Sequence, residues 1–279
     1  MEWAFLNDKI KSKINGWKKR KISFTGRATL IRSVLLSIPI YHLSFSKFPK
    51  CVVDEIQSYF SKFLWGGGLE DRKIHWVKWD DLCVGYGLGG LNFKNLNWFN
   101  TTLMAKWIWR FLVDKHLLWA KAVRACHGEF VWENGGLDDT NGKITQIGWW
   151  KIVLGISRGD DGKWLRDNVE VVLGEGDSLS FWHDWWIGEG KLSEKFPRLF
   201  RISNNKHGTV KSMGIWVEGT WRWNLEWSRE PRGREHDQIQ SLISIINCCV
   251  LRVDKRDGWS WKASSNGVFS IKSAYEAIS

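Results

Sequence analysis

The chain has 279 residues, of which 43% are hydrophobic and 22 are tryptophan, and its formal net charge is +11. This length and apolar content suffice for a buried core, which we expect in two units. Charged residues interrupt the longest apolar stretch and no secretory leader is recognisable, so membrane insertion and secretion are not expected. Five scattered cysteines are typical of reduced thiols, which predicts an intracellular protein of the nucleus or cytoplasm.

The positive charge is concentrated near the N-terminus. Residues 1–50 contain eight lysines and three arginines against only Glu2 and Asp8, a net charge of +9. The rest of the chain is almost neutral. A basic segment on a balanced body favours an anionic partner at one place on the protein.

The first region, residues 1–127, is predicted to be mainly helical. Apolar residues recur there at three- and four-residue steps, as they do along one face of an amphipathic helix. A short strand is expected at Ile74–Val77. The predicted helices cover residues 3–17, 25–37, 50–66, 96–112 and 117–125.

The second half combines strands and helices. The polar stretch 128–162 is predicted to be a linker or loop. In the Trp-rich region 163–258, alternating residues predict a hairpin that turns at Gly174–Asp177 and returns through Phe181. We further expect an extended segment at 216–227 and a helix at 234–247. Residues 259–279 are predicted to form a second hairpin and a final helix, which makes the fold class α+β.

No catalytic or metal site is evident in the sequence. A polymerase needs carboxylates that converge on Mg²⁺, and reverse transcriptases place two of them in an aromatic-x-Asp-Asp turn. The pairs Asp80-Asp81, Asp138-Asp139 and Asp160-Asp161 lack that context. We interpret Asp80 as a helix N-cap and the other two pairs as solvated loops. The cysteines form no ligand-spaced pair, so neither a metal nor a cofactor is expected.

Short motifs occur in a fixed order along the chain. They include Gly26-Arg27-Ala28-Thr29, Phe63-Leu64-Trp65-Gly66, Lys106-Trp107-Ile108-Trp109, Phe181-Trp182-His183-Asp184 and Gly267-Val268-Phe269-Ser270. In order and spacing they resemble the C-terminal (thumb and connection) part of the reverse transcriptases of plant LINE-type (non-LTR) retrotransposons. The resemblance covers the chain from about Trp17 to Ser279.

The resemblance implies a division of roles. Residues 1–127 would correspond to a thumb-like region that grips primer-template duplex, and 259–279 to a truncated start of the family's zinc-binding domain. The catalytic carboxylates of the RNA-directed DNA polymerase would precede Met1, so this chain is expected not to be an enzyme. Cys126-His127-Gly128 departs from the family's Lys-Tyr-Gly at that position.

Two sets of residues are candidates for contact with nucleic acid. The cations Lys18, Lys19, Arg20, Lys21, Arg27 and Arg32 are predicted to contact the backbone of a duplex or an RNA–DNA hybrid. The aromatic side chains Trp221, Trp223 and Trp227 are candidates for base stacking. The alternatives are a solvated basic face and tryptophans that fill a core.

The expected function is therefore non-catalytic nucleic-acid binding by a remnant of a reverse transcriptase. Two alternatives stay open: a degenerate retroelement product with no selected activity, and a scaffold that binds protein partners through exposed tryptophan.

Overall fold

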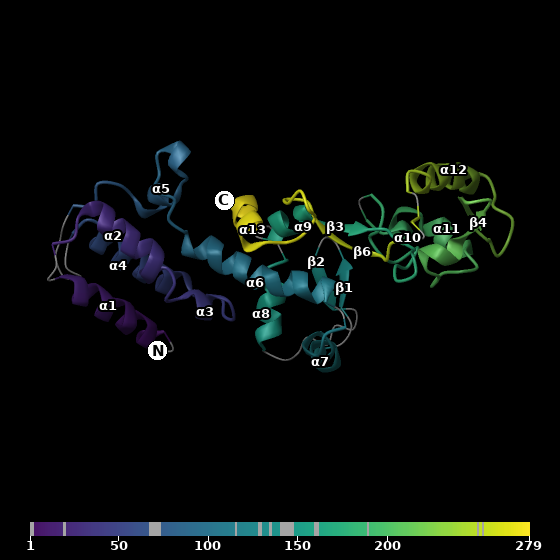
Figure 1. The fold of residues 1–279 in the computed structure, drawn as a ribbon. Helices are drawn as coiled ribbons and strands as arrows, with labels where there is room; N and C mark the ends of the chain where they lie inside the picture. Colours follow the sequence, from purple (N-terminus) through teal and green to yellow (C-terminus); the bar gives the residue numbers. More distant parts are fainter. Residues whose placement is uncertain are drawn as a thin grey trace. The chain divides into compact units, whose positions relative to one another are not determined.

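The computed structural model describes residues 3–18, 21–66, 74–114, 116–127, 130–133, 136–139, 148–158, 162–188, 190–249, 251–252 and 254–279. The chain forms two compact units, unit 1 (Met1–Trp107 and Ala274–Ser279) and unit 2 (Ile108–Ser273). Helices and antiparallel strand pairs both occur, which confirms the α+β class (Figure 1). Among the described helices, none is long and apolar enough to cross a membrane.

Unit 1 is built mainly from helices, as predicted. A π-helical turn, η1 (Ile31–Leu35), extends the second helix, and the 3-10 turn η2 (Tyr86–Leu88) precedes the sixth. The helices are α1 (Ala4–Lys18), α2 (Phe24–Leu30), α3 (Ile40–Leu43), α4 (Lys50–Leu64), α5 (Trp79–Cys83), most of α6 (Leu96–Val113) and the end of α13 (Ile271–Ile278).

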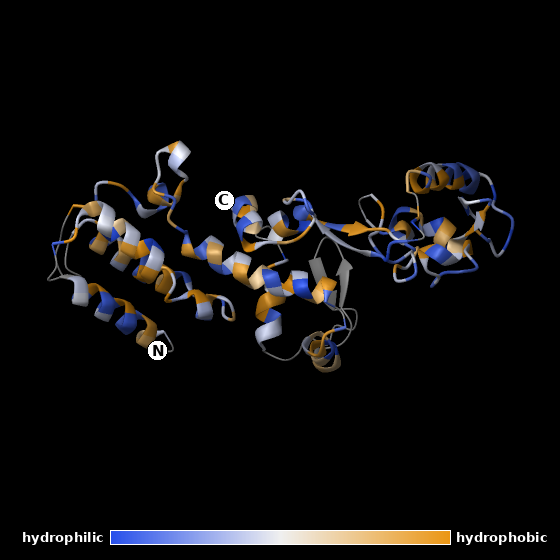
Figure 2. Ribbon diagram, viewed as in Figure 1, coloured by the Kyte–Doolittle hydropathy of each residue, from blue (hydrophilic) through white to orange (hydrophobic). Residues whose placement is uncertain are grey.

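The core of unit 1 lies around α4, against which both α1 and α2 pack (Figure 1). Figure 2 shows hydrophilic and hydrophobic residues mixed along these helices, as amphipathic packing requires. Aromatic ring pairs at both ends show that α1 and α4 run parallel. The ring centroids of Trp3 and Phe48, just before the two helices, lie 4.1 Å apart, and those of Trp17 and Phe63, near the C-terminal ends, lie 5.6 Å apart. The end of α1 and the end of α4 therefore lie on the same side of unit 1.

Two local predictions in unit 1 were wrong. Ile74–Val77 forms no strand, and Trp76 is 75% exposed, because none of the strands that the structure describes pairs with this segment. Asp80 is not an N-cap, since Lys78 occupies that position and Asp80 lies in the first turn of α5. A carboxylate there is still favourable, because it faces the positive end of the helix dipole.

Unit 2 contains secondary structure where a linker was predicted. A hairpin of β1 (Phe130–Glu133) and β2 (Gly136–Asp139) and the helix α8 (Trp149–Gly155) fall within 128–162. The linker prediction is thus wrong for the described part of that stretch. The other elements are α7 (Leu118–His127), α9 (Lys163–Asn168), β3 (Val169–Val172), α10 (Leu192–Lys195), α11 (Pro197–Ile202), η4 (Val210–Met213), β4 (Gly214–Val217), β5 (Thr220–Trp223), α12 (Arg234–Ile246) and β6 (Gly258–Trp261).

Strand pairing in unit 2 is less local than predicted. β3 pairs with β6 in an antiparallel ladder that sets Val169 opposite Trp261, so neither predicted hairpin forms. The loop after β3 is instead held by Asp257, whose carboxylate accepts hydrogen bonds from the backbone N–H groups of Gly174 (2.8 Å), Gly176 (2.9 Å) and Ser178 (2.9 Å).

Tryptophan supplies much of the core of unit 2. Phe181 and Trp182 are fully buried beside Leu242 and Ile246 of α12, which confirms the helix predicted at 234–247. The indole N–H of Trp182 donates to the Ser203 hydroxyl at 3.2 Å. The high tryptophan content is therefore used at least in part to fill this core.

Candidate nucleic-acid interface

The predicted nucleic-acid-binding cations begin at Lys18, where α1 ends. Lys18 is the last residue of α1; its side chain, together with Lys19 and Arg20, lies outside the described residues. Lys21 is described and exposed. It lies just before Ser23, whose hydroxyl caps α2 by accepting from the Gly26 N–H at 3.2 Å.

Arg27 is engaged within unit 1. Its Nε donates to the carbonyl of Leu64 at 2.7 Å, and its Nη1 donates to the carbonyl of Ile22 at 2.7 Å. Leu64 is the last residue of α4, where helical carbonyls lack partners in their own helix. Arg27 therefore caps α4 and fastens it to the start of α2.

Arg32 is engaged in the same way. Its Nη2 donates to the carbonyl of Leu91 at 2.7 Å, and its guanidinium lies 5.1 Å and 5.3 Å from the ring centroids of Tyr86 and Phe93. These contacts hold the loop between α5 and α6 through cation–π attraction and one charge-assisted bond. Both predicted arginines therefore have intramolecular partners in unit 1.

Two further lysines belong with the basic segment, and the sequence interpretation did not single them out. Lys9 and Lys13 are exposed and lie four residues apart, which places them on one face of α1. Lys11 differs: its ammonium lies 5.0 Å from the ring centroid of Tyr59, and a hydrogen bond with that residue raises the pKa of Lys11. The four-residue spacing of Lys9 and Lys13 was the signal available in the sequence.

The three candidate stacking tryptophans pack against the core of unit 2. The ring centroid of Trp223 lies 5.9 Å from that of Trp186 and 5.6 Å from that of Trp221, the latter in an edge-to-face arrangement. Trp227 is half-buried and pairs by a β-bridge with Ser203. Their burial supports the alternative interpretation, in which these side chains fill a core.

The Asp-Asp pairs named in the sequence lie far apart along the chain, and the two described pairs belong to different elements. Asp80 and Asp81 lie in α5, where Asp80 Oδ1 accepts from Asn95 Nδ2 at 3.2 Å. Asp138-Asp139 lies in β2, and Asp160-Asp161 lies outside the described residues. Within the part of the chain that the structure describes, no three His, Cys, Asp or Glu side chains form a group that could hold a metal ion.

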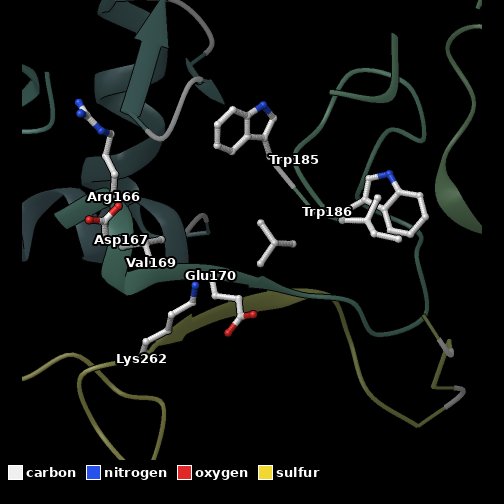
Figure 3. A pocket seen from close by; sticks show the side chains of 10 residues that line it. Arg166, Asp167, Val169, Glu170, Trp185, Trp186 and Lys262 are labelled. Atoms are coloured by element: carbon white, nitrogen blue, oxygen red, sulfur yellow. The ribbon is translucent and has the colours of Figure 1, made fainter. Parts of the chain in front are cut away.

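Unit 2 contains a cavity of about 310 Å³ beside the β3–β6 ladder (Figure 3). Figure 3 shows Glu170 and Lys262 on the ladder side and Trp185 across the cavity. Arg166 and Asp167 also line it, so the lining contains two cations and two carboxylates and their charges balance. Balanced charge gives this cavity no general attraction for phosphate.

The chain is similar in sequence to two plant proteins. No family model matches the chain. The chain is 28% identical, over 97% of its length, to a protein of Arabidopsis thaliana that is named as a ribonuclease H protein, and it spans only 42% of that protein. It is also 29% identical over 156 residues, 54% of its length, to an uncharacterized mitochondrial protein of the same plant, of which the match covers 94%. These matches support a retroelement-derived plant protein; neither name mentions a reverse transcriptase.

Proposed function

We propose that this chain is the C-terminal, non-catalytic part of a retroelement reverse transcriptase and that it binds the backbone of primer-template nucleic acid through its N-terminal basic segment. The basic segment comprises Lys9, Lys13 and Lys18–Lys21. The observation that carries the proposal is the concentration of charge, since residues 1–50 account for +9 of the net charge of +11.

The packing of unit 1 supports this proposal. Arg27 and Arg32 have intramolecular partners, and Lys11 interacts with Tyr59, so these cations serve the fold. Lys9, Lys13 and Lys21 are exposed at or near α1, which leaves their ammonium groups accessible to phosphates. Lysines that displace counterions from phosphates bind with little dependence on base sequence.

A charge-matched pair of variants tests the assignment. We expect replacement of Lys18, Lys19, Arg20 and Lys21 by alanine to weaken binding to an RNA–DNA hybrid, measured by fluorescence anisotropy at low salt. The control replaces four exposed lysines outside residues 1–50, Lys121, Lys151, Lys195 and Lys206, and lowers the net charge equally. If both variants lose the same affinity, only net charge matters and the basic segment is not the binding site.

The absence of polymerase activity is part of the same proposal. We expect no template-dependent primer extension with Mg²⁺ or Mn²⁺, because the Asp pairs lack the aromatic-x-Asp-Asp turn. Extension by the purified chain that disappears in an Asp80→Asn, Asp81→Asn variant would contradict it.

A further inference from the structure

Unit 1 carries a group of aromatic side chains that stays exposed to solvent. The exposed rings are those of Phe5 (53% exposed), Tyr41 (70%) and Phe45 (41%). Phe5 lies in the first turn of α1, Tyr41 lies in α3, and Phe45 follows α3. Exposed apolar side chains that are scattered singly are ordinary, whereas a contiguous group of them marks an interaction site.

Ring contacts join these side chains into one surface. His42 bridges two of them, with its ring centroid 5.1 Å from that of Phe5 and 5.3 Å from that of Tyr41. The ring centroid of Phe45 lies 5.4 Å from that of Tyr41 and 5.5 Å from that of Trp107 in α6. These five residues define the aromatic surface of unit 1.

The backbone beneath the aromatic surface is fixed to α6. The side-chain amide of Asn100 donates to the carbonyls of Leu43 (2.7 Å) and Ser46 (2.8 Å). The indole N–H of Trp107 donates to the carbonyl of Ser44 at 2.8 Å. A ligand would therefore meet a backbone that is already held in place, which lowers the entropic cost of binding.

Lysines continue the aromatic surface along α1. Lys9 and Lys13 follow Phe5 at four-residue steps, which places the three side chains on one face of that helix, and both lysines are exposed. Lys47, four residues after the end of α3, is exposed as well. Asp8 is the only acidic residue in the sequence of α1, against four lysines. The ligand that matches aromatic rings beside cations has flat, uncharged rings on an anionic backbone.

The length of α1 separates the aromatic surface from the cations that follow this helix. Lys18 lies 13 positions after Phe5, about 20 Å along a helix that rises 1.5 Å per residue. Bases in one strand of a duplex rise about 3.4 Å each, so this length equals about six nucleotides. A duplex bound at Lys18–Lys21 therefore needs an unpaired extension of about six nucleotides to reach the aromatic surface.

We infer that the aromatic surface binds the unpaired bases of a single-stranded extension of the primer-template, while Lys9 and Lys13 contact its phosphates. Every base has a flat face, so stacking on exposed rings needs no particular base sequence. A blunt duplex hides those faces inside its own base stack, so it does not occupy this surface. The inference rests on the proposed function, to which it adds the contacts of unpaired bases.

A pair of extended hybrids separates stacking from charge. One RNA–DNA hybrid carries an extension of six nucleotides, and the other carries six abasic nucleotides, which have the same phosphates and no bases. The full chain should bind the first about tenfold or more tightly, because each stacked base adds about a factor of five or more. Fluorescence anisotropy at constant salt measures this ratio of dissociation constants, with the extension at a 3′ end and at a 5′ end. A ratio of one at both ends would overturn the inference.

Tyr41 has the most exposed ring of the surface, so its variants locate the stacking site. Tyr41→Ala should lower the ratio about fivefold, and Tyr41→Phe, which keeps the ring, should preserve it. Trp76→Ala is the matched control, because Trp76 is 75% exposed in unit 1 and lies outside the aromatic surface. A ratio that survives in Tyr41→Ala, or that falls equally in Trp76→Ala, would overturn the inference.

Two comparisons separate this inference from the proposed function. Alanine replacement of Lys18–Lys21 should weaken binding of both extended hybrids by the same factor and leave their ratio intact. If that variant loses no affinity while the ratio persists, the basic segment is not the binding site and the stacking surface stands alone. If both hybrids bind equally well and the lysine variant weakens both, the stacking inference fails and the proposed function stands.

A protein occupant of the same surface gives a different result. If a second copy of the chain covers the aromatic surface, Tyr41→Ala will change the mass measured by sedimentation equilibrium and leave the ratio of dissociation constants unchanged. That result would overturn the inference. With bases as the occupant, Tyr41→Ala should lower the ratio and leave the salt slope of blunt-hybrid binding unchanged, because a phenol ring displaces no counterion.

Discussion

Arginine side chains join segments of unit 1 that are distant in the sequence. Arg27 connects α2 to the end of α4, and Arg32 connects η1 to the loop before α6. Both bonds reach backbone carbonyls, which a planar guanidinium can do at fixed angles and a lysine cannot reproduce. A basic residue in this segment can therefore serve the fold, the ligand or both, and substitution separates these roles.

Replacement of Arg27 by lysine should lower stability. The variant loses at least one of the two bonds to carbonyl oxygens, so the free energy of unfolding should fall by about 1–3 kcal/mol. Denaturant unfolding measures this change. The slope of nucleic-acid affinity against salt should stay the same, because the number of cations does not change.

An unchanged stability of the Arg27→Lys variant would contradict the capping role. The companion variant Lys21→Ala tests the reverse assignment. It should leave stability within about 0.5 kcal/mol, because an exposed surface side chain contributes little. It should also flatten the salt slope by about one unit if Lys21 contacts a phosphate.

Glu235 should make the stability of unit 2 depend on pH. Its carboxylate accepts from both Nη atoms of Arg229, at 2.7 Å and 2.8 Å, and from the N–H of Arg232 at 2.8 Å. The bonds with Arg229, followed by the bond from Arg232, lower the pKa of Glu235 from 4.5 to about 2.

A carboxylate whose pKa is lower in the folded than in the unfolded state stabilises the fold at any pH above its unfolded-state pKa. This stabilisation is lost as the pH falls towards its folded-state pKa. Glu235 should therefore add stability above pH 4.5 and lose that contribution between pH 4.5 and about pH 2. Denaturant unfolding of the wild type and of Glu235→Gln at pH 6 and pH 3 measures this contribution to the free energy of unfolding. A difference between the two proteins that is the same at both pH values would contradict this account.

At the scale of elements, one carboxylate holds the loop that follows β3 next to the start of β6. Asp257 lies just before β6, and it accepts from three backbone N–H groups of the loop after β3, as well as from the hydroxyl of Ser178 at 3.1 Å. The contact crosses about 80 residues of sequence, and it aligns the two strands in their register.

Asp257→Ala should loosen this loop. It leaves the N–H groups of Gly174, Gly176 and Ser178 without their acceptor, so unfolding free energy should fall by about 1–3 kcal/mol. Hydrogen exchange should accelerate at those three amides. The control Asp254→Ala removes an exposed carboxylate three residues earlier and should change neither quantity. Unchanged exchange in Asp257→Ala would show that the carboxylate is not what holds the loop.

Local periodicity predicted the helices well. The stripes of α1, α4 and α12 are buried where the spacing places them, because a helix can be recognised from contacts within a few turns of the same segment. The strands were predicted less well, because β3 and β6 depend on a partner far away in the sequence. Ile74–Val77 has apolar character but pairs with no strand in the described part of the chain, so its pattern alone was misleading.

The candidate sites show the same limit. Charge density identified the basic segment, yet nothing in the sequence indicates that Arg27 would reach the carbonyl of Leu64, 37 residues away. Gln57 lies on an apolar helix face, which is a signal of an unusual buried amide. That Trp79 and His75 lie near Gln57 is information that only the tertiary structure supplies.

At the scale of the whole molecule, the charge is unevenly distributed along the chain. The excess positive charge belongs to the first 50 residues, and the nearly neutral remainder includes the Trp-rich core of unit 2. The candidate stacking residues Trp221, Trp223 and Trp227 pack against that core, so we assign the contacts with the nucleic-acid backbone to the basic segment.

The salt dependence of binding tests the central claim most directly. Log K for an RNA–DNA hybrid is measured against log salt for the wild type and for the variant with Lys18, Lys19, Arg20 and Lys21 replaced by alanine. Each phosphate contact contributes a slope of about −0.9 on B-form DNA, so the replacement should flatten the slope by about three to four units. Tryptophan fluorescence should report an intact fold in both proteins. A slope that the replacement leaves unchanged, in a folded variant, would contradict nucleic-acid binding through this segment.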